Sequence, residues 1–174
     1  IHTMPPLAPH RSPETMIDRI EAAVAEILSG QRGADASRRS EPVLASPRVP
    51  DVLAVLGGEH TISAGVVRGL ARAQGTDNLV AVQIDAHVDL YDTYEGSRYS
   101  HACAARRIVE TCPIFQIGIR NIGAAEEQFR RQSDRVRTFF AEDALEGPEL
   151  IEELGRFVRG KRVFLTIDLD GLDP

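Results

Sequence analysis

The chain has 174 residues, of which 20 are basic and 26 acidic, so its formal charge is −6. This acidic balance argues against nucleic acid or an anionic membrane surface as the main partner, and no apolar run reaches the ~18 residues of a membrane span. The length suits one domain. The two cysteines do not make a disulfide framework, so we expect a soluble cytoplasmic protein.

The N-terminal part of the chain predicts one helix followed by a loop. Ser12 and Pro13 are typical of a helix start, as the N-cap and the first helical residue. Apolar residues follow at helical spacing up to Leu28. Residues 31–50 contain Gly, Ser, Pro and arginine without an apolar period, which predicts a flexible surface loop.

From residue 51 onward, strands and helices are predicted to alternate. Apolar runs predict strands at 52–58, 78–85, 112–120, 136–140 and 162–170. Helical spacing and helix-end signals predict helices at 61–73, 101–111, 124–131 and 147–160. Strands that are apolar on both faces are typical of parallel sheets covered by helices on both sides. We therefore predict an α/β fold with a mainly parallel sheet.

Three of the predicted strands end in residues of the types that bind metal ions. The segments are Gly57-Gly58-Glu59-His60, Asp85-Ala86-His87-Val88-Asp89 and Asp168-Leu169-Asp170-Gly171-Leu172-Asp173. Sites in open parallel sheets lie beyond the carboxyl ends of the strands. Residues two apart in an extended segment face the same side, so Asp85, His87 and Asp89 are expected to converge. The same rule brings Asp168 and Asp170 together.

Four carboxylates in one partly buried pocket would repel one another strongly. Two divalent cations would balance the charges of Asp85, Asp89, Asp168 and Asp170. Carboxylate and imidazole ligands without a thiolate favour Mn²⁺, Fe²⁺ or Zn²⁺. Taken singly, each motif also has a simple structural interpretation, because Asp-x-Asp is common in turns and paired glycines permit tight turns. The metal interpretation depends on the three motifs occurring together.

The three motifs, in their order and rough spacing, resemble the signatures of the ureohydrolase family of arginases and agmatinases. The matching stretches are GGEHTIS, VQIDAHVDLYDTYEGSRYSHA and TIDLDGLDP. The stretch from Tyr94 to Ala102 is most similar to the agmatinase branch. The resemblance implies a three-layer α/β/α fold, two Mn²⁺ ions, and hydrolysis of a guanidinium group to urea and an amine. The expected substrate is a small cationic guanidine, in particular agmatine, which would give putrescine, a polyamine precursor.

The resemblance also implies a role for each site residue. His60 and Asp89 would bind one manganese ion, and His87 and Asp170 the other. Asp85 and Asp168 would bridge both ions, and a hydroxide held between the ions would attack the guanidinium carbon. His101 would carry protons to the leaving amine, which suits an imidazole. Arg106 and Arg107 are interpreted as solvent-exposed helix positions.

The chain also departs from the family pattern. Residues 1–174 are interpreted as a fragment of a single domain, with a sheet incomplete at both ends, because the C-terminal third of the family domain and its first strand are absent. By resemblance, a full-length relative would form a homotrimer or homohexamer.

Other functions remain open from the sequence. The chain could be another ureohydrolase, such as an arginase or a guanidinobutyrase, or an inactive truncated remnant with a binding role. The deacetylase relatives use a similar layout with one zinc, but His60 with Asp89 supplies a second set of ligands here. A nucleotide-binding protein is disfavoured, because the chain has neither G-x-G-x-x-G nor a P-loop motif.

Overall fold

The computed structural model describes residues 6–30, 52–144 and 148–172. Within them, four strands form one parallel sheet in the order β3-β2-β1-β4. The strands are β1 (Leu79–Ile84), β2 (Ile114–Ile119), β3 (Val136–Phe140) and β4 (Arg162–Ile167). The predicted parallel α/β fold is confirmed, and these four strands fall where the sequence places them. The predicted loop at 31–50 lies outside the described residues.

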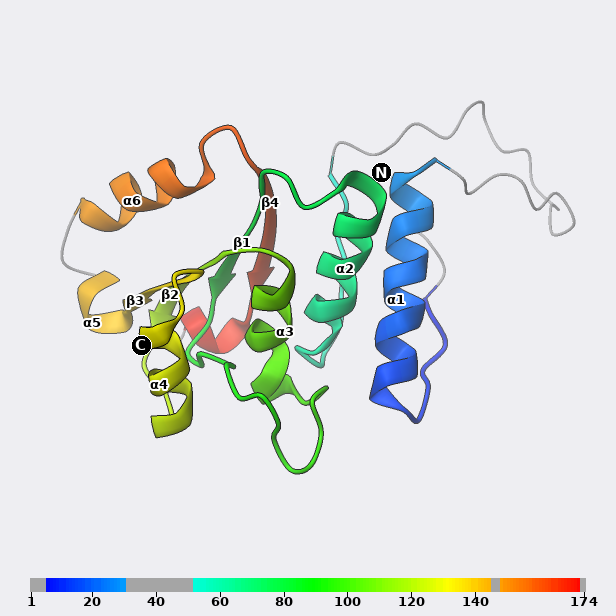
Figure 1. Ribbon diagram of the computed structural model, residues 1–174, viewed down its shortest axis with the longest axis horizontal. Coiled ribbons are helices and arrows are strands. Elements are labelled where there is room, and N and C mark those ends of the chain that lie inside the picture. Colours follow the sequence, from blue (N-terminus) through cyan, green and yellow to red (C-terminus); the bar gives the residue numbers. More distant parts are fainter. Residues whose placement is uncertain (1–5, 31–51, 145–147, 173–174) are drawn as a thin grey trace, which may run out of the picture.

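Helices cover the sheet on both faces (Figure 1). They are α1 (Pro13–Leu28), α2 (Ile62–Gln74), α3 (Ala104–Thr111), α4 (Ala124–Gln132), α5 (Ala141–Ala144) and α6 (Glu149–Val158), with short 3-10 helices η2 (His101–Cys103) and η3 (Leu169–Leu172). On one face, Ile108 of α3 lies in the main core with Ile114 of β2. On the other face, Phe157 of α6 packs against Phe115 of β2, with ring centroids 5.3 Å apart.

One face of β4 stays open within the described part of the chain. Val163, Leu165 and Ile167 alternate along the strand and are 46%, 52% and 54% exposed. The intervening residues Phe164 and Thr166 face the opposite side, toward α2. Within the described residues, helices therefore cover only one of the two faces of β4.

The predicted strand at 52–58 is wrong. The structure has no strand at residues 52–57, and Val52 and Leu56 are 84% and 97% exposed. An apolar run becomes a strand only when a neighbouring strand takes up its backbone hydrogen bonds. Among the described residues, this segment pairs with no strand, and β4, an edge strand, pairs only with β1.

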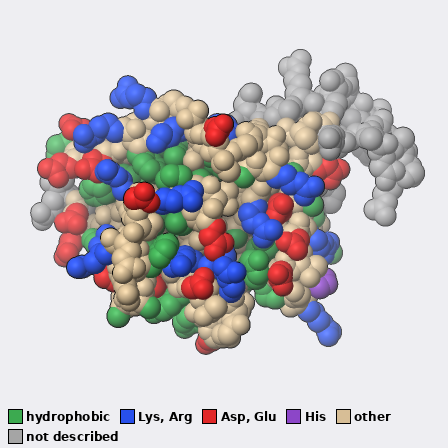
Figure 2. All heavy atoms as spheres, viewed as in Figure 1, with side chains coloured by type: hydrophobic (Ala, Val, Ile, Leu, Met, Phe, Trp, Pro, Cys, Tyr) green, Lys and Arg blue, Asp and Glu red, His purple; other side chains and the backbone are tan. Residues whose placement is uncertain are grey.

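The first two helices begin as the sequence predicts and pack closely together. The Ser12 hydroxyl caps α1 by accepting a hydrogen bond from the Thr15 amide at 3.3 Å. Arg68 of α2 forms an ion pair with Glu21 of α1 at 2.8 Å, and charged side chains of both signs are interspersed over the face shown in Figure 2. No described helix has both the length and the apolar character needed to span a bilayer.

The close approach of α1 to α2 depends on glycine. A methyl group at Gly69 would lie 2.6 Å from Cβ of Val24 and 2.8 Å from the carbonyl oxygen of Glu21. We expect Gly69→Ala to lower the free energy of unfolding by about 1–2 kcal/mol, because the overpacking outweighs the ~1 kcal/mol helix preference of alanine. Urea denaturation measures this change. The control is Gly155→Ala in α6, where a methyl group meets no atom within 4 Å, and a control loss as large as that at Gly69 would contradict the packing argument.

Candidate metal centre

A polar cavity of about 560 Å³ opens at the carboxyl ends of β1 and β4. Its walls come from the turn before α2, the loop after β1, the start of η2 and the segment after β4. All seven site residues predicted from the sequence line it: His60, Asp85, His87, Asp89, His101, Asp168 and Asp170. The structure therefore brings together in one place residues that are dispersed over more than a hundred positions of the sequence.

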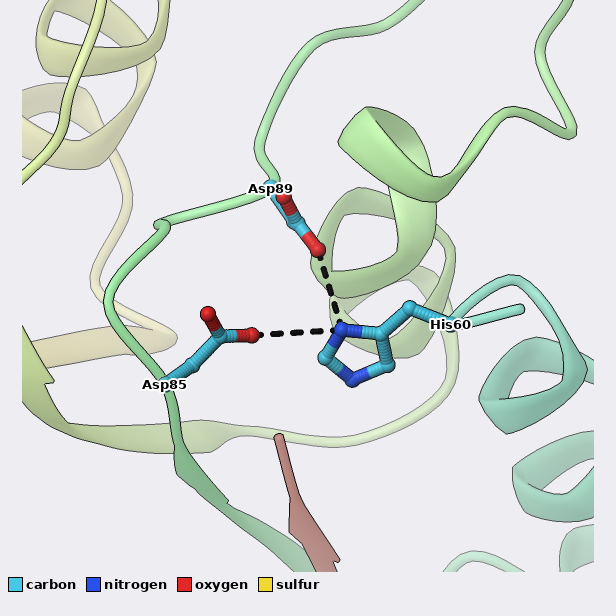
Figure 3. Close-up of side chains that lie close together, drawn as sticks. All are labelled: His60, Asp85 and Asp89. Carbon is cyan, nitrogen blue, oxygen red and sulfur yellow. Dashed lines mark ion pairs between the residues drawn. The ribbon is translucent and has the colours of Figure 1, made fainter. Parts of the chain in front are cut away.

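The first cluster of possible metal ligands is His60, Asp85 and Asp89, whose nearest ligand atoms lie within 4.8 Å of one another. Nδ1 of His60 lies 3.2 Å from Oδ2 of Asp85 and 3.2 Å from Oδ2 of Asp89 (Figure 3). Both carboxylates are buried, and the imidazole is only 10% exposed. One imidazole nitrogen thus faces two carboxylate oxygens in a largely water-excluded space.

The electrostatics of this cluster favour a positive charge at its centre. Burial alone would lower the pKa of His60, but hydrogen bonds to Asp85 and Asp89 and their negative charges raise this pKa to about 10. Burial alone would raise the pKa of Asp85, yet hydrogen bonds from His60, the His87 amide and Gln83 lower it. Burial raises the pKa of Asp89 despite its hydrogen bond with His60. A proton on His60 therefore occupies the position that a metal cation would take.

The second cluster is Asp85, His87 and Asp170. Nδ1 of His87 lies 3.0 Å from Oδ2 of Asp170 and 3.7 Å from Oδ1 of Asp85. Asp85 therefore belongs to both clusters, and its two oxygens face different partners. This is the geometry that a carboxylate bridging two cations requires.

The remaining carboxylate, Asp168, lies beside the first cluster. Its Oδ2 is 3.6 Å from Nδ1 of His60, and its side chain is 41% exposed. It belongs to neither three-residue cluster within the described part of the chain. Asp168 and Asp170 thus face different histidines, one facing His60 and the other His87.

The rule that residues two apart in an extended strand face the same side does not explain why these side chains converge. The strand β1 ends at Ile84 and β4 ends at Ile167, so all the acidic ligands lie in loops or in η3. Asp89 has a left-handed backbone with φ of 51°, a conformation that aspartate tolerates better than most residues. Loop turns, rather than an extended backbone, aim these side chains into the cavity.

His101 lies on the outer wall of the cavity. Its side chain is 66% exposed, its Nδ1 is 4.0 Å from a carboxylate oxygen of Glu59, and its ring meets the edge of Tyr94. Glu59 accepts a hydrogen bond from the Thr61 amide at 3.0 Å, which shapes the turn that holds His60. A titratable imidazole therefore stands between the ligand clusters and solvent.

Glu126 is a buried carboxylate of the cavity that the sequence did not single out. One of its oxygens accepts a hydrogen bond from the Leu90 amide and the other from the Gly123 amide, both at 2.8 Å. The side chain thus joins the start of α4 to the loop that carries Asp89. The helix-start pattern at Gly123 was the available signal, since glutamate at the third helical position closes a capping box.

The prediction that Arg107 is solvent-exposed is wrong. Its side chain is only 4% exposed, and its Nη2 lies 2.6 Å from Oδ1 of Asp92. The guanidinium carbon of Arg106 lies 3.5 Å from the centre of the Phe129 ring, so Arg106 also packs against the protein. Arg107 thus joins α3 to the loop between β1 and η2, and Arg106 joins α3 to α4.

The parallel α/β sheet carries at its carboxyl edge clustered aspartate and histidine side chains that could hold metal ions. The model of the arginase family matches residues 2–174, so the chain belongs to the arginase family. The resemblance drawn from the sequence is confirmed.

The chain is also similar to individual members of this family. It is 41% identical over 120 residues to N(1)-aminopropylagmatine ureohydrolase of Synechocystis, covering 68% of this chain and 39% of that protein. It is 39% identical over 128 residues to mitochondrial arginase 1 of Arabidopsis thaliana, covering 69% and 35%. The crystal structure of agmatine ureohydrolase of Thermoplasma volcanium superposes with a TM-score of 0.71 at 27% identity, covering 97% of this chain and 50% of that one. The chain thus spans about two fifths of the length of these curated relatives.

Proposed function

We propose that this chain carries the metal centre of a ureohydrolase that cleaves a small guanidinium compound to urea and an amine. Agmatine is the proposed substrate, and putrescine the proposed amine product. The observation that carries the proposal is the pair of ligand clusters sharing Asp85, at the carboxyl edge of the sheet of an arginase-family chain.

The residues present fit two divalent cations. His60, Asp85 and Asp89 would hold one ion, and Asp85, His87 and Asp170 the other, with Asp168 as the second proposed bridge. Four carboxylates around the cavity need about four positive charges for balance. Oxygen and imidazole donors suit Mn²⁺ in this setting. The negative charges of Asp85 and Asp89, which raise the pKa of His60, support a site that favours positive charge.

Bound divalent ions would supply Lewis acidity that activates water toward an electrophilic guanidinium carbon. Glu59, which lines the cavity with a half-exposed side chain and is not a proposed metal ligand, would attract a cationic substrate to the entrance. His101 would deliver a proton to the leaving amine, because imidazoles exchange protons near neutral pH.

The names of the relatives leave several guanidines as candidates. Aminopropylagmatine, agmatine and arginine share the guanidinium group and differ in the chain attached to it. The proposal of agmatine is supported by the similarity of the Tyr94–Ala102 stretch to the agmatinase branch and by the structural neighbour named agmatine ureohydrolase.

The test is release of urea from agmatine, aminopropylagmatine, arginine and guanidinobutyrate, with added Mn²⁺ and after chelation. We expect Mn²⁺-dependent urea release that is highest with agmatine and is abolished by His87→Ala or Asp168→Ala. The control is His10→Ala, because His10 is exposed, precedes α1 and is not among the residues that line the cavity.

Two outcomes would contradict the proposal. Unchanged urea release in the His87 and Asp168 variants would show that the clusters are not the active site. One tightly bound zinc ion per chain in metal analysis, without urea release, would favour the deacetylase-like alternative.

A further inference from the structure

A row of polar side chains crosses the sheet near the carboxyl ends of its strands. Thr138 of β3, Gln116 of β2, Gln83 of β1 and Thr166 of β4 are direct neighbours in the sheet pairing. Gln83 and Gln116 are 0% exposed, although buried glutamine is uncommon in an apolar sheet. We refer to these four residues as the polar row.

The hydrogen bonds of the polar row run in one direction. The carboxylate of Asp85 can only accept, so Gln83 presents its NH₂ group to Oδ2 of Asp85, at 2.8 Å. The Gln83 carbonyl then accepts from the NH₂ group of Gln116 at 2.8 Å. The Gln116 carbonyl in turn accepts from the hydroxyl of Thr138 at 3.0 Å. The Asp85 carboxylate thereby fixes the orientation of the Gln83 amide, and the Gln83 amide fixes that of Gln116.

The same two glutamines also hold the backbone of the loop after β1. The NH₂ group of Gln83 lies 3.3 Å from the carbonyl oxygen of His87, and that of Gln116 lies 2.8 Å from the carbonyl oxygen of Val88. The polar row therefore fixes both the Asp85 carboxylate and the loop that carries His87 and Asp89.

The other end of the polar row contacts His60. The Thr166 hydroxyl lies 3.1 Å from Nε2 of His60 and 3.3 Å from the hydroxyl of Ser63. A histidine that binds a metal through Nδ1 must carry its proton on Nε2, and a partner that accepts this proton fixes the ring and its tautomer. Thr166 is placed to be that partner.

We propose that the polar row positions Asp85 and His60, the two ligands that face each other across the first cluster, and so sets the affinity of the metal centre. Its members are positioning residues, because none of them is itself a metal ligand. This inference rests on the metal centre of the proposed function. It adds that the affinity is controlled from inside the sheet, as far away as β3.

The test uses a pair of variants at the far end of the polar row. Thr138→Val keeps the shape of the side chain and removes the hydroxyl, whereas Thr138→Ser keeps the hydroxyl and removes the methyl group. Titration calorimetry with Mn²⁺ alone measures the Kd of the purified protein. We expect Thr138→Val to weaken Mn²⁺ binding on the order of tenfold, at the lower end of the effects seen for groups that support metal ligands, and Thr138→Ser to leave it unchanged.

Two further variants extend the test along the polar row. Gln83→Met, next to the ligand, is expected to raise the Kd on the order of 10- to 100-fold. Ile114→Val is the control, because Ile114 is buried in the same sheet and pairs with Ala81 and Val136 rather than with a member of the polar row, and its Mn²⁺ affinity is expected to match wild type. Thermal unfolding of the metal-free proteins identifies any variant that does not fold, and the Thr138 pair decides the question if Gln83→Met is such a variant.

The outcomes separate this inference from the proposed function. If wild type binds Mn²⁺ and Thr138→Val binds it equally well, or if valine and serine weaken binding alike, the positioning role is overturned while the metal centre stands. If wild type does not bind Mn²⁺, the metal centre itself is overturned, and the inference with it.

Discussion

Replacing Asp85 by asparagine is expected to abolish the binding of both metal ions. Asp85 is the only residue shared by the two ligand clusters of the described chain, and its two oxygens face His60 and His87 separately. An amide has one oxygen and no charge, so it cannot bridge two cations, and each cluster loses the carboxylate that the two share. Metal analysis after desalting should find a fall from two Mn²⁺ ions per chain to none.

Single-cluster variants serve as the comparison. Asp89→Asn and Asp170→Asn each alter one cluster, so each is expected to retain one ion. Two ions bound to the Asp85→Asn protein would show that the bridge lies elsewhere, with Asp168 as the remaining candidate.

Replacing Gly171 by alanine is expected to have the next largest effect on the metal centre. A methyl group at this position would lie 2.7 Å from the backbone nitrogen of Asp85 and 2.8 Å from its Cα, and backbone atoms cannot move aside as a flexible side chain can. The segment η3 would therefore shift away from β1 and carry Asp170 with it. We expect Mn²⁺ affinity to fall on the order of 10- to 100-fold, with a loss of about 1–3 kcal/mol in the free energy of unfolding.

Local hydrogen bonds explain why this shift reaches the second cluster. Asp170 is held by the Ala86 amide, which donates to Oδ1 at 3.1 Å, and by Arg120, which donates to its carbonyl oxygen at 2.6 Å. Both contacts require η3 to lie directly against the end of β1. Calorimetry on Gly171→Ala beside Gly155→Ala separates this effect from a general cost of adding a methyl group, and wild-type affinity in the Gly171 variant would refute the argument.

The paired strands were predictable because each is a short apolar run between helices. The segment 52–58 has the same pattern, yet it forms no strand. Apolar periodicity reports which side chains avoid water, but it carries no information about whether a neighbouring backbone is available. Val52 and Leu56 are exposed in a segment that pairs with no strand among the described residues.

The candidate ligands of the site were predictable by residue type, and their geometry was not. Chemistry identifies aspartate and histidine at strand ends as possible ligands, and all six candidates line one cavity. The positive φ of Asp89 and the 3-10 turn at Asp170 are loop conformations that no strand rule anticipates. Gln83 and Gln116 were also missed, although a glutamine at the same level of two adjacent apolar strands was visible once the strands were aligned.

The adjacency of β1 and β4 has a consequence for the order of folding. Ala86 and Asp170 are joined by a hydrogen bond although they are 84 residues apart in the sequence. Closing so long a loop costs entropy that local contacts do not, so we expect this junction to form late in folding. Metal ions bound across it would stabilise contacts that the folding transition state lacks, and would therefore slow unfolding rather than speed folding. The proposed metal centre would in this way give kinetic stability to the junction of β1 and β4.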